Sequence, residues 1–309
     1  MLLFGIVPLF TEVKAQTENE IPDNMWDGNW FDNDYEDERI ELDIDFTGDP
    51  RNPIRPPVCP DTLTLMTYNI AKKEYKENAK LIKQSNPDVV AVQEIHEILH
   101  TSNFSTLKKE TGLVGCFVSI YDYPGAFITG AFTTAVQYGI ALLWNPNRVG
   151  TPKISVQKIK SSKADHDPRR AYIIAEFNDF CFIATHYSSA KEPTEDRMKM
   201  TQSILNEDIV KNYRKPVYIA GDLNESPHNG KAIELFRKTD FEVLNDTTRN
   251  AEGEYEQYTR ESKAMIDLIL EKNTNPNREV IKSCRPAGAD TTFKILSDHT
   301  PYVVKVKFR

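Results

Sequence analysis

Residues 217–224 read Val-Tyr-Ile-Ala-Gly-Asp-Leu-Asn. The first four residues carry no charge and favour extended backbone, which is typical of a strand buried within a sheet. Polar residues follow directly, so we expect the strand to end near Gly221 and to present Asp222 and Asn224 at the edge of the sheet. In an extended segment these two side chains lie on the same side.

The same pattern, an apolar run that ends in a polar residue, recurs elsewhere in the chain. The polar residues at the ends of these runs are Asn69, Glu94, His186, Asp267 and the pair Asp298-His299. A single residue of this kind is usually an ordinary polar group at a strand end. Six such places in one chain indicate a shared site instead.

The remaining pattern indicates the fold class. Strand-like runs lie at 63–70, 89–93, 116–121, 139–144, 171–177, 181–186, 217–221, 266–270 and 302–306, and helical spacing of apolar residues occurs at 74–84, 194–212 and 230–238. Some strands alternate with helices and others follow one another directly. This arrangement predicts a layered α/β sandwich with mixed sheets.

The N-terminal part differs from the rest in composition. Residues 1–16 are mostly apolar, with small residues near their end, and resemble a signal peptide or its remnant, so we expect an exported protein, periplasmic or secreted. Residues 17–60 are first acidic and then proline-rich, which predicts a linker before a catalytic domain at 61–309. No later run is long enough to cross a membrane, so we expect no integral membrane segment in the mature chain, and we expect a monomer.

Charge is also distributed unevenly. Residues 17–49 carry thirteen acidic side chains and one basic one, whereas the whole chain has a net charge of −8. The remainder is therefore net basic, which suits an anionic substrate.

Cysteines give no sign of a structural zinc site. The four residues, Cys59, Cys116, Cys181 and Cys284, show no CxxC or Cys/His spacing. Their disulfide pairing stays open.

The polar residues at the strand ends have the chemistry of phosphate-ester hydrolysis. That reaction needs a cation to neutralise phosphoryl oxygens, a group that orients or activates water, and donors for the charge of the transition state. Carboxylate and amide oxygens without cysteine suit Mg²⁺, Mn²⁺ or Ca²⁺ better than zinc.

Taken in order, these motifs resemble a known family. The set is Met66-Thr67-Tyr68-Asn69-Ile70, Val92-Gln93-Glu94, Thr185-His186, Gly221-Asp222-Leu223-Asn224 with Pro227, Ile266-Asp267 and Ser297-Asp298-His299. It resembles the endonuclease/exonuclease/phosphatase superfamily over roughly residues 61–309. The resemblance implies an α/β four-layer sandwich of two packed mixed β-sheets flanked by helices.

The resemblance also implies roles for the residues. Glu94 is expected to be the principal metal ligand, with Asn69 beside it and Asp298 on the same or a second ion. Asp222 would polarise the attacking water, and Asn224 would position the water and the phosphate. His186 and His299 would stabilise the transition state or protonate the leaving group, with Asp267 orienting His299.

Substrate contacts are expected from two further places. The segment 166–171 resembles a basic stretch of the family, so Arg169 or Arg170 could approach the active face. The aromatic loop 121–138, which includes Tyr138, could stack bases or meet lipid, or it could pack on its own domain.

The substrate itself is open within this class. We expect a phosphodiesterase of nuclease type with nucleic acid as a possible partner, and a sphingomyelinase-like enzyme or a small-molecule phosphatase is the alternative. A third class is a catalytically inactive binding module on the same fold. No residue of the active set is missing, so nothing supports this class.

One rival motif points to different chemistry. His96-Glu97-Ile98-Leu99-His100 fits the pattern of zinc peptidases, in which two histidines one helical turn apart bind zinc. The distant alternative is therefore a zinc peptidase, and the plain interpretation is a surface helix with two histidines.

Overall fold

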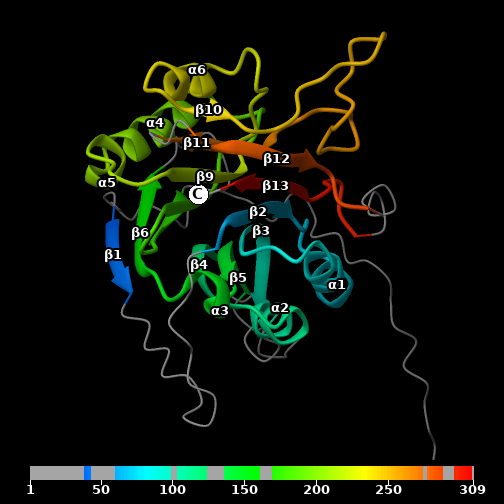
Figure 1. Ribbon diagram of the computed structural model, residues 1–309. Helices are drawn as coiled ribbons and strands as arrows, with labels where there is room; N and C mark the ends of the chain where they lie inside the picture. The colour runs from blue at the N-terminus through cyan, green and yellow to red at the C-terminus, as the bar shows by residue number, and fades with distance from the viewer. Residues whose placement is uncertain are drawn as a thin grey trace, which may run out of the picture. The chain divides into compact units, whose positions relative to one another are not determined.

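The computed structural model (Figure 1) describes residues 38–42, 60–98, 103–123, 136–160, 169–273, 277–287 and 296–307. The chain divides into two compact units, Met1–Asp34 and Tyr35–Arg309, and all described residues belong to the second. None of the described helices is long and apolar enough to span a membrane.

A seven-stranded mixed sheet forms one half of the second unit. Its strands, in spatial order, are β1 (Glu38–Leu42), β6 (Lys153–Lys160), β7 (Arg169–Glu176), β8 (Cys181–His186), β9 (Val217–Asp222), β11 (Asp267–Lys272) and β10 (Glu242–Val243). Only the pair β8 and β9 is parallel among these described strands.

A six-stranded mixed sheet forms the other half. Its order is β12 (Glu279–Cys284), β13 (Tyr302–Lys307), β2 (Thr62–Asn69), β3 (Val89–Ile98), β5 (Val136–Trp144) and β4 (Val114–Tyr123), with β2 and β3 parallel.

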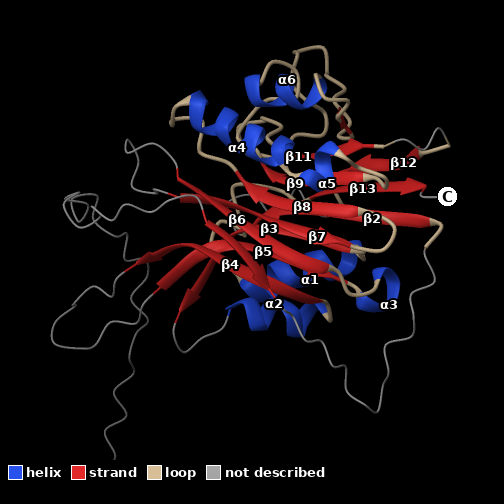
Figure 2. Ribbon diagram, turned by 90° about the vertical axis from the view of Figure 1, so that its left-hand side faces the viewer, coloured by secondary structure: helices blue, strands red, loops and turns tan. Residues whose placement is uncertain are grey.

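Helices cover the outer faces of both sheets (Figure 2). On the side of the six-stranded sheet lie α1 (Tyr75–Ser85), α2 (Asn103–Thr111) and the short α3 (Pro146–Val149). On the other side lie α4 (Thr194–Asn206), α5 (Asp208–Lys211) and α6 (Lys231–Arg237). The predicted sandwich of two mixed sheets flanked by helices is confirmed.

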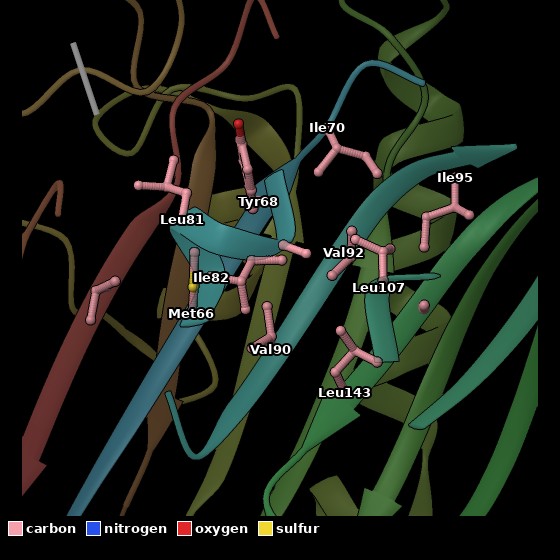
Figure 3. Close-up of a cluster of buried hydrophobic side chains, with 13 residues drawn as sticks. Met66, Tyr68, Ile70, Leu81, Ile82, Val90, Val92, Ile95, Leu107 and Leu143 are labelled. Atoms are coloured by element: carbon pink, nitrogen blue, oxygen red, sulfur yellow. The ribbon is translucent and has the colours of Figure 1, made fainter. Parts of the chain in front are cut away.

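Successive side chains of β2 point to opposite faces, so this strand contacts both a helix layer and the other sheet. Met66 and Tyr68 belong to a buried apolar cluster with Leu81 and Ile82 of α1 (Figure 3). Residues one step along the strand point to the opposite face, so Asn69 faces the seven-stranded sheet, where β2 contacts β9 and β11. Strand alternation therefore places a polar side chain between the two sheets.

Most predicted elements have their counterparts in the structure, with shifted ends. Helix 194–212 is two helices, α4 and α5, because the backbone becomes extended at Glu207. Strands β1, β6, β10 and β12 and helices α2 and α3 were not predicted.

The stretch 17–60 requires a correction. The prediction of a linker is wrong for Glu38–Leu42, because these residues form β1 and pair with β6. Arg39, the one basic residue of the acidic run, forms an ion pair with Glu207 at 2.7 Å. This ion pair connects β1 to the end of α4. The acidic composition concealed the alternation Arg39, Ile40, Glu41.

Several predictions concern residues outside the described part of the chain. They include the signal peptide at 1–16, the rest of the linker, Cys59, and residues 124–135 of the aromatic loop. Cys116, Cys181 and Cys284 are free thiols.

Candidate active site

Three adjacent strands bring three site residues into register. The Cα partners of Asp222 at the end of β9 are His186 on β8 and Asp267 on β11. Side chains in register on neighbouring strands point to the same face, so the three groups converge. Gly221 makes this close pairing possible, since a Cβ there would lie 2.0 Å from the carbonyl oxygen of Thr185.

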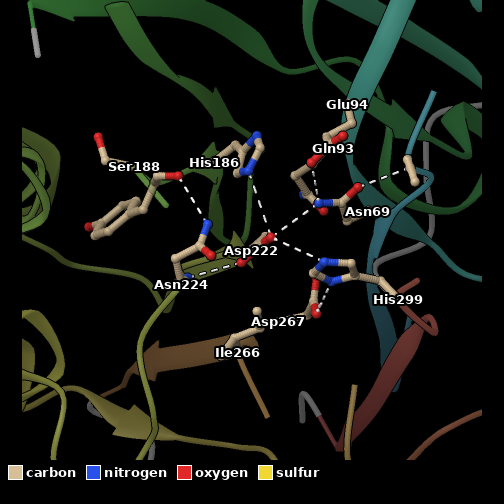
Figure 4. A network of polar contacts seen from close by, with 12 residues as sticks. Asn69, Gln93, Glu94, His186, Ser188, Asp222, Asn224, Ile266, Asp267 and His299 are labelled. Atoms are coloured by element: carbon tan, nitrogen blue, oxygen red, sulfur yellow. Dashed lines mark hydrogen bonds and ion pairs between the residues drawn. The ribbon is translucent and has the colours of Figure 1, made fainter. Parts of the chain in front are cut away.

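Asn69 joins this group from the other sheet. Its Nδ2 donates hydrogen bonds to Oε1 of Glu94 at 3.0 Å and to Oδ2 of Asp222 at 3.1 Å (Figure 4). The amide thus holds two carboxylates together that would otherwise repel each other.

Glu94 occupies an irregular position in β3. The strand pairing with β5 shifts register between Val92 and Ile95, and Glu94 has φ of 60°, in the left-handed region. Bulges of this kind redirect a side chain next to active sites. Here the bulge turns Glu94 toward Asn69, and the side chain stays 24% exposed.

Asp222 lies at the centre of the site. Its Oδ2 is 3.7 Å from Nε2 of His186 and 3.7 Å from Nε2 of His299. Both imidazoles point toward Asp222 in Figure 4. Its Oδ1 accepts a hydrogen bond from the backbone N–H of Asn224 at 2.9 Å. Asp222, His186 and His299 are all nearly inaccessible to solvent.

Burial and neighbouring charge separate the protonation of the two histidines. Burial lowers the pKa of His186 well below its usual range, and the positive charges of Arg170 and His299 lower it further. Burial also lowers the pKa of His299, but the carboxylates of Asp267 and Asp222 outweigh it and raise that pKa to about 10. One imidazole is therefore neutral and the other cationic at neutral pH.

The pKa of the Asp222 carboxyl group is higher than that of an ordinary aspartate. Burial and the negative charge of Asp267 raise the pKa of Asp222 to about 7, against the lowering effect of His299 and of the hydrogen bonds from Asn224 and Asn69. A carboxyl group with this pKa can exchange a proton near neutral pH.

Asp267 fixes the orientation of His299. Its Oδ2 lies 2.8 Å from Nδ1 of the imidazole. The start of β11 is itself held by Thr259, a buried residue whose hydroxyl accepts hydrogen bonds from the N–H groups of Ile266 and Asp267, each at 3.1 Å. The sequence analysis missed Thr259, because its role arises from a loop that folds back onto the strand.

Asn224 is placed differently from the sequence prediction. Its φ is 49°, so the strand has ended and the pair Asp222 and Asn224 does not share one side of an extended segment. A turn brings the two together instead, and the Asn224 side chain donates to the carbonyl of Tyr187 at 3.2 Å.

The side chain of Asp298 is exposed to solvent, whereas that of its neighbour His299 is buried. The Asp298 side chain is 48% exposed and pairs with Arg260 at 3.4 Å, and one carboxylate oxygen lies 4.0 Å from Nε2 of His299. Asp298 therefore lies at the solvent-exposed edge of the site around Asp222. Its predicted role as a metal ligand stays a prediction.

Tyr138 and Arg170, two of the expected substrate-contact residues, lie near His186. Arg170 is buried and paired with Glu192 at 3.0 Å. Tyr138 is buried, with its hydroxyl 3.4 Å from Nδ1 of His186. The backbone of Arg169 belongs to β7, and its side chain is outside the described part.

The zinc-peptidase motif does not have the geometry that zinc binding requires. His96 and Glu97 lie on β3, not on a helix, so both the peptidase alternative and the interpretation as a surface helix are wrong for these residues. The Glu97 carboxylate accepts a hydrogen bond from the N–H of Phe104 at the start of α2. His100 lies outside the described residues.

The donor set fits a hard divalent cation. Oxygen ligands are those that Mg²⁺, Mn²⁺ and Ca²⁺ prefer, and Glu94 offers a partly exposed carboxylate beside Asn69 and Asp222. Asp222, Asp267 and His299 also have potential ligand atoms within 4.8 Å of one another. However, the hydrogen bond to Asp267 and the raised pKa of His299 make this imidazole a cation, and a metal ligand must be neutral. Glu94 is the better placed ligand.

Solved structures of other proteins share this fold. The catalytic domain of human Nocturnin with bound sulfate has 17% identity and a TM-score of 0.60, over 88% of this chain and 98% of that one. A mannosyl-6-phosphatase of Bacteroides thetaiotaomicron has 15% identity and a TM-score of 0.56, over 79% and 99%. An endonuclease/exonuclease/phosphatase of Beutenbergia cavernae has 17% identity and a TM-score of 0.59, over 80% and 72%.

No curated protein sequence matches the chain. The model of the Endonuclease/Exonuclease/phosphatase family matches residues 66–299, a range that contains every strand-end motif from Met66 to His299. The chain therefore belongs to the endonuclease/exonuclease/phosphatase family and has its phosphoesterase fold.

Proposed function

We propose that the protein hydrolyses phosphate esters with the help of a divalent cation such as Mg²⁺. The observation that supports this proposal is the convergence on Asp222, whose carboxylate contacts Asn69 from one sheet and both histidines. Glu94, Asp222 and His299 thus face one shared centre, although they are far apart in the sequence.

Glu94 would hold the cation, with Asp298 as a further ligand; the amide oxygen of Asn69, its predicted ligand atom, instead accepts a hydrogen bond from the N–H of Ala71. The cation, when bound, supplies positive charge that polarises the phosphoryl group. Asn69 would keep Glu94 and Asp222 at a fixed separation through its two hydrogen bonds.

Asp222 would orient the attacking water and accept its proton. The oxygen of that water forms a bond to phosphorus while the bond from phosphorus to the leaving-group oxygen breaks. A carboxyl group with a pKa of about 7 is suited to this transfer, because it can take up and release a proton near neutral pH. Asn224 would help to place water and phosphate.

The two histidines would have different tasks. Cationic His299 would donate a proton or a charged hydrogen bond to an oxygen on which negative charge grows. His186 would act as a neutral donor. If the Tyr138 hydroxyl donates to Nδ1 of His186, the ring proton is on Nε2, which faces Asp222.

The test is hydrolysis of generic phosphate esters before and after removal of divalent ions. We expect activity that disappears in chelator and returns with Mg²⁺ or Mn²⁺, and a loss of about 100-fold or more in Asp222→Ala, as for removal of a general base. Full activity in chelator would reject the metal role. A matched control is Asp246→Ala, since Asp246 lies in a loop and accepts hydrogen bonds from Thr248.

The cations around Asp222 bear on the size of the proposed substrate. A nuclease-type phosphodiesterase was expected from the sequence, and such an enzyme binds the phosphate backbone through many unpaired cations. Two cations near the centre are already paired, Arg170 with Glu192 and Arg260 with Asp298. This pairing favours a small phosphate ester, the alternative, over a polymer.

A further inference from the structure

Lys72 is a cation at the centre that the proposed mechanism does not use. It lies in the loop between β2 and α1, and its Nζ is 4.0 Å from Oε2 of Glu94. The same Nζ is 4.6 Å from the ring centroid of Tyr138, whose hydroxyl reaches His186. Lys72 therefore lies between the proposed metal ligand and the neutral histidine.

The backbone around Lys72 adopts a conformation that is unfavourable for its residues. Ala71, Lys72 and Glu74 have φ of 47°, 64° and 40°, in the left-handed region. Side chains with a Cβ adopt this region at a cost, and strain of this kind concentrates at functional sites. The loop thus uses unfavourable backbone to direct Lys72 to the centre.

Two site residues hold this loop in place. Oδ1 of Asn69 accepts a hydrogen bond from the N–H of Ala71 at 3.0 Å. The N–H of Lys72 donates to the carbonyl oxygen of Glu94 at 3.1 Å. The position of Lys72 is therefore fixed by Glu94, which would hold the cation, and by Asn69, which donates a hydrogen bond to Glu94.

The next residue, Lys73, provides an internal comparison. It is exposed, its N–H donates to the carbonyl of Ile70, and its own carbonyl accepts from the Asn78 side chain. Lys72 and Lys73 thus have the same charge and adjacent positions, but the backbone of Lys73 contacts Ile70 and Asn78 of α1.

The charges around Lys72 indicate which ligand would neutralise its ammonium group. When a divalent cation binds Glu94, the carboxylate is shared and the nearby ammonium group is left beside a second positive charge. Phosphoryl oxygens can neutralise both cations at once. A phosphate monoester at neutral pH carries almost two negative charges and a diester only one, so a second cation favours the monoester.

We infer that Lys72 binds a phosphoryl oxygen of the substrate and makes the enzyme select phosphate monoesters over diesters. This inference rests on the proposed function. Lys72 would thus be a specificity-determining residue at the entrance of the site, and its 38% exposed side chain leaves it accessible to substrate.

The test compares p-nitrophenyl phosphate with bis(p-nitrophenyl) phosphate in four proteins: wild type, Lys72→Met, Lys72→Arg and Lys73→Met. At about pH 8 the monoester is a dianion, because its second pKa is about 6. We expect Lys72→Met to lower kcat/KM for the monoester by about 10- to 100-fold, the effect of one lost hydrogen bond to a charged group. The diester should lose much less, Lys72→Arg should retain most of the preference, and Lys73→Met should match wild type.

A binding measurement separates Lys72 from the chemical step. Titration calorimetry with inorganic phosphate in excess Mn²⁺ should show weaker phosphate binding in Lys72→Met than in wild type and Lys73→Met. Titration with Mn²⁺ alone should show tighter binding in Lys72→Met, because a nearby positive charge has been removed.

The outcomes that contradict the inference are distinct from those that contradict the proposed function. Equal losses on both esters, or unchanged phosphate binding in a folded Lys72→Met protein, would overturn the role of Lys72. Hydrolysis of neither ester by wild type with any divalent ion would overturn the proposed function, and the phosphate titration would still decide on Lys72.

Discussion

Nδ1 of His299 lies 2.8 Å from Oδ2 of Asp267, and both side chains are buried. This contact fixes the ring orientation and leaves Nε2 facing Asp222. Because the carboxylate favours the charged form of the imidazole, the pair would act as a source of positive charge beside the phosphoryl group in the proposed reaction.

Replacing Asp267 by Asn should lower the pKa of His299 from about 10, because the main stabilising charge is lost. The alkaline limb of the pH profile of kcat/KM should therefore move to lower pH, with kcat reduced by about 100-fold or more. A profile with an unchanged alkaline limb would contradict this role of the pair.

The same substitution should change stability with a defined sign. The pKa of His299 is raised in the folded state, from 6.5 to about 10. Wild type should thus gain stability from the pair fully below about pH 6.5 and lose that gain as pH rises through about 10. Denaturant titrations across this range should show the difference between wild type and Asp267→Asn narrowing toward high pH.

Asn69 should lower the pKa of Asp222, since its Nδ2 donates to the ionised carboxylate. In Asn69→Ala we expect this pKa to rise above the value of about 7 in wild type. The carboxyl ¹³C chemical shift of Asp222, followed against pH in protein treated with chelator, measures the change without interference from a metal ion. A fall of the pKa would show that Asn69 does not favour the carboxylate.

Much of the site was predictable because strands place their last residues at a common edge. Asn69, His186 and Asp222 each end an apolar run of simple pattern, so their convergence followed from fold class. The bulge at Glu94 was not predictable, because its φ of 60° depends on the pairing of β3 with β5. Strand β6 was missed because lysines interrupt its apolar residues, although Ile154, Val156 and Ile159 are buried.

The bulge leads to a stability prediction at Glu94. Because its φ is 60°, a residue with a Cβ is disfavoured there and glycine is not. In metal-free protein, Glu94→Gly should be more stable than Glu94→Ala by about 1 kcal/mol. Urea denaturation of the two variants in chelator measures this difference directly. Equal stabilities would mean that the bulge relaxes once the carboxylate is gone.

Thr259 should be a positioning residue for the pair Asp267 and His299. Its hydroxyl accepts from two N–H groups at the start of β11, and its carbonyl oxygen accepts from the N–H of Thr300 at 2.8 Å. Valine has the same shape but no acceptor, so Thr259→Val leaves two buried donors unsatisfied. We expect a loss of about 2 kcal/mol or more in the free energy of unfolding.

Stability alone would not distinguish positioning from packing, so the pH profile provides the second measurement. If Thr259 holds Asp267 against His299, Thr259→Val should also move the alkaline limb of kcat/KM to lower pH, in the same direction as Asp267→Asn. Thr259→Ser retains the hydroxyl and should retain the wild-type limb even if it is somewhat less stable. A valine variant that is destabilised but keeps the wild-type pH profile would assign Thr259 to folding only, since the geometry of the pair would then survive without the hydroxyl.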